Sequence, residues 1–290
     1  MHIPVLLNQV MEYLQPRPNQ SFIDCTVGGG GHALGLLSLI EPKGKLLGID
    51  LSKEAIGSLE FKAQNLKLSQ RFILVIDNFA HLKEIAKRNN FSPVNGILLD
   101  LGLSSDLLEE SGRGFSFMRD EKLDMRYNPD LTDLTAEKIV NQYPEQELIE
   151  IFKRYGGERF SRRVGKKIAQ VRAKQKIDTT IQLKEIVKSA LGKYFHTKSL
   201  ARIFQSLRIA VNNELENLKQ GLLNGVDVLA PQGRIVVISY HSLEDKIVKD
   251  FFKEEGRLKI LTKKPVQPSK GEVEKNRRCR SAKLRAAEKI

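Results

Sequence analysis

The sequence predicts an α/β fold, in which a mainly parallel sheet is covered by helices on both faces and interrupted by an inserted, mainly helical domain. Two observations support this prediction. Five short apolar runs, typical of strands buried on both faces, are separated by helical segments. The fourth and fifth runs lie about 130 residues apart, whereas the other intervals are roughly 20 to 25 residues long. A crossover helix needs far fewer residues, so the long interval indicates an insertion.

The predicted strands follow one another as residues 22–24, 45–50, 71–77, 97–100 and 233–239. The first four end on a carboxylate: Asp24, Asp50, Asp77 and Asp100. Parallel strands place their carboxyl ends at the same edge of a sheet, where ligands bind in open α/β folds. We therefore expect these carboxylates to face a common site.

The helices are predicted from capping residues and apolar spacing. Ser52, followed by Glu54 in the first turn, opens a helix after the second strand. A further helix, 213–229, precedes the fifth strand. Four helices are expected within the insert, at residues 145–155, 161–174, 180–191 and from 197 onward.

A turn of four consecutive glycines, Gly28 to Gly31, joins the first strand to a helix. Such a turn lets the backbone approach an adenosine-containing cofactor, and an acid that ends the next strand, here Asp50, binds the ribose. The spacing fits both a nicotinamide dinucleotide and S-adenosyl-L-methionine. Asp24 lies four residues before the first glycine and would repel a pyrophosphate, whereas S-adenosylmethionine brings only an ammonium, a sulfonium and a carboxylate. Asp24 thus favours S-adenosylmethionine; the alternatives are a dehydrogenase and glycines that only turn the chain.

Positive charge is concentrated in two stretches. The net charge is +13, and residues 153–176 hold ten Lys/Arg against one acid, while residues 263–290 hold ten against three. The first stretch lies entirely in the predicted insert. Clustered positive charge is typical of proteins that bind a polyanion such as RNA. The alternative for either stretch is a solvated basic helix face.

The remaining composition limits the protein class. Two cysteines without metal-ligand spacing argue against a disulfide framework and a metal site. The chain shows no signal peptide and no apolar run long enough to span a membrane. We therefore expect a cytoplasmic protein that binds neither metal nor membrane.

Several residues at the predicted edge have either a functional or a structural role. Phe79 covers an adenine or belongs to the core, and Asp100 faces the transferred group or caps a turn. His32 lies near the cofactor or is structural, and His241 is a proton acceptor, a phosphate contact or structural.

The loop after Asp100 alternates glycines, aromatics and arginines. The ring of Phe115 or Phe117 could stack on an unpaired base. The guanidinium group of Arg113, Arg119 or Arg126 could then bind the phosphates of the same RNA. Alternatively, the phenylalanines pin the insert to the sheet.

The chain resembles the RsmH (MraW) family, bacterial methyltransferases that act on the exocyclic N4 amine of a cytidine in the decoding (P-site) region of 16S ribosomal RNA. The resemblance rests on long motifs spread along the chain: residues 2–7, 30–32, 97–105, 113–120, 123–126, 155–160, 204–212, 241–245 and 280–285.

The strand spacing places the insert at about residues 105–211. The resemblance implies that this insert is an RNA-recognition domain and that residues 1–104 and 212–290 form a class I (Rossmann-like) methyltransferase domain. Such sheets end in an antiparallel strand pair, so residues 256–261 and 281–287 are expected to be strands, the latter against its helical propensity. The partner would be 16S ribosomal RNA or the small subunit; a homodimer is left open. A non-catalytic RNA-binding protein remains the alternative.

The resemblance also implies the cofactor-contacting positions: Gly30, Gly31, His32, Asp50, Phe79, Asp100 and Leu107. The family commonly has proline and glutamine where this chain has Asp106 and Leu107. A leucine can line a pocket but offers no amide. Asp100, or a nearby carbonyl, is the expected hydrogen-bond acceptor for the cytosine amine, since the prolines of an Asp-Pro-Pro motif are missing after Asp100.

Overall fold

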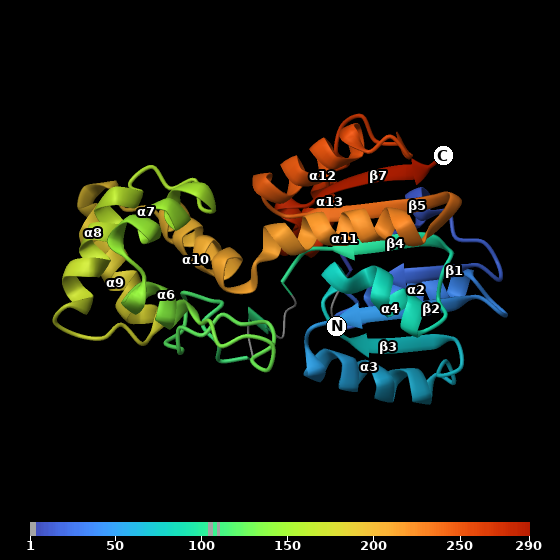
Figure 1. Cartoon of the computed structure of the whole chain (residues 1–290), viewed down its shortest axis with the longest axis horizontal. Helices are drawn as coiled ribbons and strands as arrows, with labels where there is room; N and C mark the ends of the chain where they lie inside the picture. Colours follow the sequence, from blue (N-terminus) through green and yellow to red (C-terminus); the bar gives the residue numbers. More distant parts are fainter. Residues whose placement is uncertain (1–3, 104–106, 109–110) are drawn as a thin grey trace. The chain divides into compact units, whose positions relative to one another are not determined.

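The computed structural model describes residues 4–103, 107–108 and 111–290. The chain divides into two compact units (Figure 1). Unit 1 comprises Met1–Gly102 and Leu215–Ile290, and unit 2 comprises Leu103–Glu214. The chain therefore leaves unit 1 directly after the fourth strand and returns before the fifth.

Unit 1 contains one sheet of seven strands in the described part of the chain. The strands are β1 (Ser21–Asp24), β2 (Lys45–Asp50), β3 (Phe72–Ile76), β4 (Val94–Asp100), β5 (Leu229–Ser239), β6 (Leu258–Ile260) and β7 (Lys283–Lys289). Their order is β3-β2-β1-β4-β5-β7-β6, with β1 to β5 parallel. β7 runs antiparallel to both β5 and β6, which confirms the predicted strand pair near the C-terminus.

The helices of unit 1 form a layer on each face of this sheet (Figure 1). They are α1 (Leu7–Leu14), α2 (Gly31–Leu39), α3 (Lys53–Asn65), α4 (Leu82–Arg88), α11 (Glu214–Val228), α12 (Ser242–Glu254) and α13 (Lys270–Lys275). α1, α2 and α3 pack on one hydrophobic cluster, and α4, α11 and α12 on the other. The predicted doubly covered α/β fold is confirmed.

The strands read as continuous apolar runs because both of their faces are buried. In β1, Phe22 contributes to one cluster and Ile23 to the other, and both are fully buried. Leu98 and Leu99 of β4 divide in the same way. Alternate side chains of a strand point to opposite faces, so each face receives its own apolar set.

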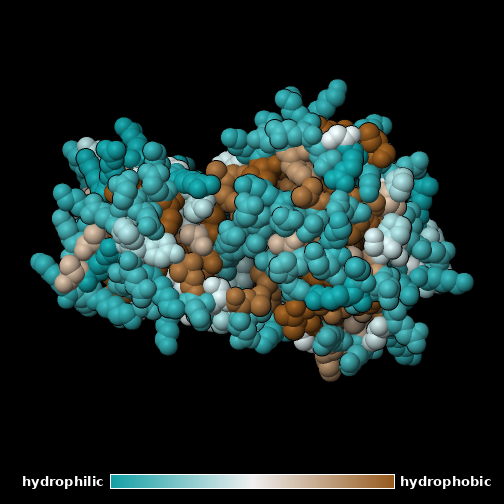
Figure 2. Space-filling view, viewed as in Figure 1, coloured by the Kyte–Doolittle hydropathy of each residue, from teal (hydrophilic) through white to brown (hydrophobic). Residues whose placement is uncertain are grey.

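Unit 2 is mainly helical and has its own core. Its helices are α6 (Ala136–Gln142), α7 (Glu145–Arg154), α8 (Ser161–Arg172), α9 (Thr180–Leu191) and α10 (Thr197–Asn212). Phe152, Val164 and Leu183 are fully buried in this core. Thr179 and Gln182 form a capping box that starts α9. The face of unit 2 drawn in Figure 2 is mostly hydrophilic.

The four helices predicted in the insert are confirmed, whereas the short α6 was not predicted. No helix in the described ranges is long and apolar enough to cross a membrane.

The close approach of β1 and β4 predicts an effect on stability. A Cβ at Gly96 would lie 2.5 Å from Cε1 of Phe22, a fully buried ring. We expect Gly96→Ala to lower the free energy of unfolding by about 1–3 kcal/mol, because an overpacked core must shift. Gly57→Ala on α3 is the control: no atom lies within 4 Å of its added Cβ, so it should stabilise by about 0.5–1 kcal/mol. Denaturant unfolding measures the free energy of unfolding of both variants. Equal changes in the two variants would contradict the prediction.

Candidate functional site

The sheet order places a candidate site at the carboxyl ends of β1 and β4. From β1 the chain adds β2 and β3 on one side, then crosses to add β4 and β5 on the other. Ligands of open α/β sheets bind where the strand order reverses in this way. Asp24 ends β1 and Asp100 ends β4, so both carboxylates lie at this point.

The glycine turn is tied to β2 and leaves part of its backbone open. The amide of Gly28 donates to Oδ2 of Asp50 at 2.8 Å, and the amide of Val27 donates to the carbonyl of Ile49 at 2.9 Å. Gly30 has φ of +78°, and a Cβ there would lie 2.4 Å from Leu59. A Cβ at Gly29 would meet no atom within 4 Å. Packing therefore requires a glycine at Gly30, while the backbone near Gly29 is accessible to a ligand.

Gly31 begins α2 and is also restricted by packing. A Cβ at Gly31 would lie 2.4 Å from Cγ of Pro4. Both predicted glycine contacts, Gly30 and Gly31, would therefore have to reach a cofactor through backbone atoms. Their role in cofactor binding stays a prediction.

Asp50 is positioned by two backbone amides. Oδ2 accepts from Gly28 at 2.8 Å, and Oδ1 accepts from the amide of Ser52 at 2.9 Å. Burial raises the pKa of Asp50, although these amide hydrogen bonds act in the opposite direction. Each carboxylate oxygen has a second lone pair, so a partly exposed Asp50 can still accept hydrogen bonds from ribose hydroxyls.

Asp100 is held between a tyrosine and a histidine. The hydroxyl of Tyr240 donates to Oδ1 of Asp100 at 2.8 Å, and Nδ1 of His32 lies 3.8 Å from Oδ2. The amide of Asp100 donates to Oγ1 of Thr26 at 2.7 Å. Burial and the charge of Asp100 raise the pKa of Tyr240 far above its usual range, so Tyr240 is a neutral donor.

The position of Tyr240 depends on a glycine at the end of β4. A Cβ at Gly102 would lie 2.8 Å from Cε2 of Tyr240. Tyr240 was not among the predicted site residues. Its contact with Asp100 joins positions 140 residues apart, which no local pattern indicates.

His32 lies in the first turn of α2 and is 7% exposed. Its Nε2 is 2.9 Å from the carbonyl oxygen of Val5. A carbonyl can only accept, so Nε2 carries the hydrogen and Nδ1 faces Asp100. His32 thus has both a structural contact and a position at the predicted cofactor edge.

Asp24 is a buried carboxyl group, 1% exposed, beside these groups. Burial raises its pKa to about 7; His32 and the amide of Thr26 lower it, and the charges of Asp100 and Asp50 raise it further. Three neighbouring carboxylates favour a positively charged occupant and disfavour a pyrophosphate. The charge of the site agrees with the prediction drawn from Asp24.

Phe79 follows β3 in a short 3₁₀ helix, Phe79–His81. Its ring packs on the core beside α11, where a Cβ at Gly221 would lie 2.5 Å from Cδ2 of Phe79. Phe79 is only partly buried. The predicted role of Phe79 in the core is therefore confirmed in part. Contact between an adenine and the exposed part of its ring stays a prediction.

Leu107 belongs to unit 2, where it is partly buried and packs against that unit's core. Its predicted cofactor contact remains untested. Asp106, which precedes it, and the two serines Ser104 and Ser105 lie outside the described residues, as do His2 and Ile3 of the N-terminal motif.

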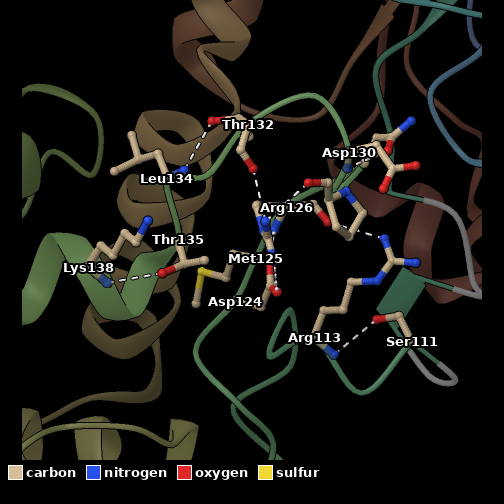
Figure 3. A network of polar contacts seen from close by, with 12 residues as sticks. Ser111, Arg113, Asp124, Met125, Arg126, Asp130, Thr132, Leu134, Thr135 and Lys138 are labelled. Carbon is tan, nitrogen blue, oxygen red and sulfur yellow. Dashed lines mark hydrogen bonds and ion pairs between the residues drawn. The ribbon is translucent and has the colours of Figure 1, made fainter.

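The arginine- and phenylalanine-rich loop is internally bonded (Figure 3). Arg113 donates to the carbonyls of Arg126 and Tyr127, and Arg126 forms an ion pair with Asp124. Arg126 also donates to the carbonyls of Pro129 and Thr132, at 3.2 and 2.9 Å. These arginines have backbone and carboxylate acceptors within unit 2, and their assignment to phosphates stays a prediction.

The two phenylalanines of this loop pack within unit 2. Phe115 is 7% exposed and stacks on Tyr127 with centroids 5.7 Å apart. Phe117 contacts Phe204 edge-on at 5.4 Å. The prediction that Phe115 stacks on a base is therefore wrong, since its ring is occupied. The exposed Arg119 remains a candidate phosphate contact.

His241 is part of the start of α12. Its Nδ1 accepts from the amide of Glu244 at 3.4 Å, and Oε2 of Glu244 accepts from the amide of His241 at 3.3 Å. This reciprocal arrangement is a capping box. The structural role considered for His241 is confirmed.

Comparison with known proteins identifies the family. The model of the MraW methylase family matches residues 1–290. The chain belongs to the MraW methylase family. It is similar to proteins named ribosomal RNA small subunit methyltransferase H from Carboxydothermus hydrogenoformans (42% identical), Heliobacterium mobile (41%) and Clostridium botulinum strain Loch Maree (41%). The alignments cover 100% of this chain and 98%, 99% and 99% of the respective relatives.

Family membership agrees with S-adenosyl-L-methionine as the cofactor. The residues at the sheet edge fit this group chemically. Asp24 and Asp100 favour the ammonium and sulfonium charges, Asp50 offers oxygen lone pairs for the ribose, and the backbone near Gly29 allows close approach. The dehydrogenase alternative has no support in the family.

The hydrogen bond from Tyr240 to Asp100 leads to a prediction for this methyltransferase. Tyr240→Phe removes the hydroxyl and keeps the ring beside Gly102. Hydrogen bonds to charged groups contribute about 1.5–3 kcal/mol, so the free energy of unfolding should fall by up to this amount, and kcat or cofactor affinity should fall about 10- to 100-fold because Asp100 loses its positioning donor. Tyr13→Phe on α1, whose ring packs against the core, is the control. Unchanged kcat and Kd in Tyr240→Phe would refute the positioning role.

The raised pKa of Asp24 predicts a pH-dependent stability. The folded-state pKa of about 7 exceeds the unfolded value of about 3.9, so the unfolded chain releases the proton first. The free energy of unfolding of the wild type, relative to Asp24→Asn, should therefore fall as pH rises from about 4 to about 7, by on the order of a few kcal/mol, and then level off. Urea unfolding of both proteins across this range is the measurement. If the free energy of unfolding changed with pH in the same way in both proteins, the prediction would be contradicted.

Proposed function

We propose that this protein transfers the methyl group of S-adenosylmethionine to the exocyclic N4 amine of a cytidine in the decoding (P-site) region of 16S ribosomal RNA. The family match and the names of the relatives support an rRNA methyltransferase of the small subunit. The resemblance of the motifs to the RsmH (MraW) family supports the N4 position. The observation that carries the proposal is the carboxylate edge formed by the buried Asp24 and the partly buried Asp50 and Asp100.

We assign the cofactor contacts to residues at this edge. When bound, S-adenosylmethionine supplies a methyl group activated by a positively charged sulfur. Asp50 would bind the ribose, Phe79 would cover the adenine, and His32 and Asp100 would lie near the charged end. Backbone atoms of Gly30 and Gly31 complete the proposed set, with Leu107 as an apolar contact.

The role proposed for Asp100 follows from the chemistry of the target. The cytosine amine is a poor nucleophile because its lone pair is delocalised into the ring. An acceptor that binds its N–H localises the lone pair, and accurate positioning lowers the barrier further. Asp100 has one oxygen bonded by Tyr240, whereas the other lies 3.8 Å from His32. Asp100 or a nearby backbone carbonyl is the acceptor in this proposal.

Unit 2 is the proposed RNA-recognition domain. Eight of the ten basic residues of the stretch 153–176 are exposed, only Lys167 and Arg172 being partly buried. The target base must be single-stranded or turned out of its helix to reach the sheet edge. Phosphate contacts would make binding strongly dependent on salt.

The decisive test offers labelled S-adenosylmethionine with unmodified small subunits, or with free 16S rRNA, to the purified protein. Mass spectrometry should then find N4-methylcytidine in the decoding region. A non-catalytic RNA-binding protein would bind without transferring label. Absence of methylcytidine on both substrates would overturn the proposed function.

The role of Asp100 can be tested separately. Asp100→Ala removes the proposed acceptor and a charge at the cofactor edge, so turnover should fall by about two orders of magnitude, in the range typical of acid–base groups. Asp250→Ala, which removes a partly exposed carboxylate on α12, is the control. Unchanged turnover of Asp100→Ala, with normal cofactor affinity, would sink the assignment.

A further inference from the structure

Unit 2 contains a pair of aromatic rings surrounded by cations. Phe160 precedes the first turn of α8, and Tyr194 ends the 3₁₀ helix Gly192–Tyr194. Their ring centroids lie 5.3 Å apart with an interplanar angle of 31°. Tyr194 is 42% exposed, which is unusual for a large ring. We call these two rings and the cations over them the Phe160–Tyr194 platform.

Three exposed cations lie over these rings. The guanidinium carbon of Arg163 is 5.3 Å from the centroid of each ring. Arg159 lies 5.6 Å from the Phe160 centroid, and Nζ of Lys193 lies 5.4 Å from that of Tyr194. Cation–π contacts of this kind restrict a long side chain without neutralising its charge. The platform therefore presents full positive charges in limited orientations.

These cations have no carboxylate partner within ion-pair distance in the part of the chain that the structure describes. Other cations of unit 2 have carboxylate partners: Lys176 pairs with Glu137 and Asp178, and Lys188 pairs with Glu185. The first turn of α8 also lacks an acidic residue, and the carboxylate of Glu158, which accepts from the amide of Phe160, is buried and makes no ion pair with these three cations. An external anion would supply the missing negative charge.

The backbone beneath the platform is fixed. Oε1 of the buried Glu158 accepts from the amide of Phe160 at 2.9 Å. A Cβ at Gly156 would lie 2.7 Å from the carbonyl oxygen of Arg202, so this loop packs closely on α10. A surface with a fixed backbone loses less conformational entropy when it binds a ligand.

We propose that the Phe160–Tyr194 platform is an RNA-binding surface, at which Arg159, Arg163 and Lys193 contact phosphates and the exposed ring of Tyr194 stacks on an unpaired base. This inference rests on the proposed function and names the surface that holds its RNA. Arginine forks match phosphate oxygens, and aromatic rings bind bases of any sequence. An acidic protein would satisfy the cations but would make little use of two adjacent rings.

The charge of the platform is tested by removing two guanidinium groups. The double variant Arg159→Gln/Arg163→Gln should bind unmodified 16S rRNA at least about tenfold more weakly. The slope of log K plotted against the logarithm of the salt concentration should become shallower by about 1 to 1.5, as expected for the loss of two phosphate contacts. Lys193→Gln should weaken binding in the same direction. Lys188→Gln is the matched control: it removes one lysine charge five positions away, from a residue paired with Glu185.

The ring of Tyr194 is tested by two substitutions. Tyr194→Phe keeps the aromatic face and should bind RNA almost like the wild type. Tyr194→Leu should bind at least about fivefold more weakly, since stacking on a base contributes about 1–3 kcal/mol. Circular dichroism and cofactor binding establish that each variant is folded.

The outcomes separate the two proposals. A wild type that neither binds nor methylates the RNA would overturn the proposed function. A wild type that binds RNA together with variants that bind equally well would overturn the platform alone. Variants that bind free RNA normally but small subunits weakly would assign the platform to a ribosomal protein, which also overturns it.

Discussion

The grouping of three carboxylates, one buried and two partly buried, at one edge of the sheet is the constraint on which unit 1 depends. Parallel strands end together, so Asp24, Asp50 and Asp100 must lie near one another at the carboxyl ends of β1, β2 and β4. Their charges are stabilised by donors from the surrounding turns: the amide of Thr26, the amides of Gly28 and Ser52, and the hydroxyl of Tyr240. The conformation of the glycine turn follows from this requirement, because its amide must face Asp50. A cationic ligand would reduce the remaining repulsion.

The insertion of unit 2 is compatible with the sheet because both of its ends are tied together. β4 and β5 pair in register, with Ile97 opposite Ile235, although unit 2 separates them in sequence. Within unit 2, Asn212 donates to the carbonyl of Met125 at 2.7 Å and accepts from the amide of Tyr127 at 2.9 Å. These bonds fix the returning chain against the outgoing one. Unit 2 is a long connection between β4 and β5, and closing a long loop costs conformational entropy. The second core and these hydrogen bonds offset this cost within unit 2, so the pairing of β4 with β5 does not have to.

The sequence predicted the strands well because burial on both faces leaves a continuous apolar run, as at residues 45–50, which form β2. Local propensity was insufficient for β7, which was assigned correctly only through the family resemblance. Contacts between distant positions were missed. Tyr240 bonds Asp100 across 140 residues, and the stacking partner of Phe115, Tyr127, lies beyond an irregular loop without helical or strand periodicity. A pattern of residue types indicates which groups are present, but not which acceptors the fold brings to them.

This distinction matters most for the arginines. The sequence offers the same residue type at Arg113, Arg126, Arg159 and Arg163, and the first three stand directly next to an aromatic residue or a glycine. The first two donate to carbonyls and a carboxylate inside unit 2, so moving them to a phosphate would break these partly buried hydrogen bonds, at a cost of about 0.5–1.5 kcal/mol for each. Arg159 and Arg163 lie over rings, and a phosphate can bind them without breaking any ion pair between described residues. The net charge of +13 therefore overstates the charge available to a polyanion, and unpaired guanidinium groups over aromatic rings are the more selective criterion for its binding surface.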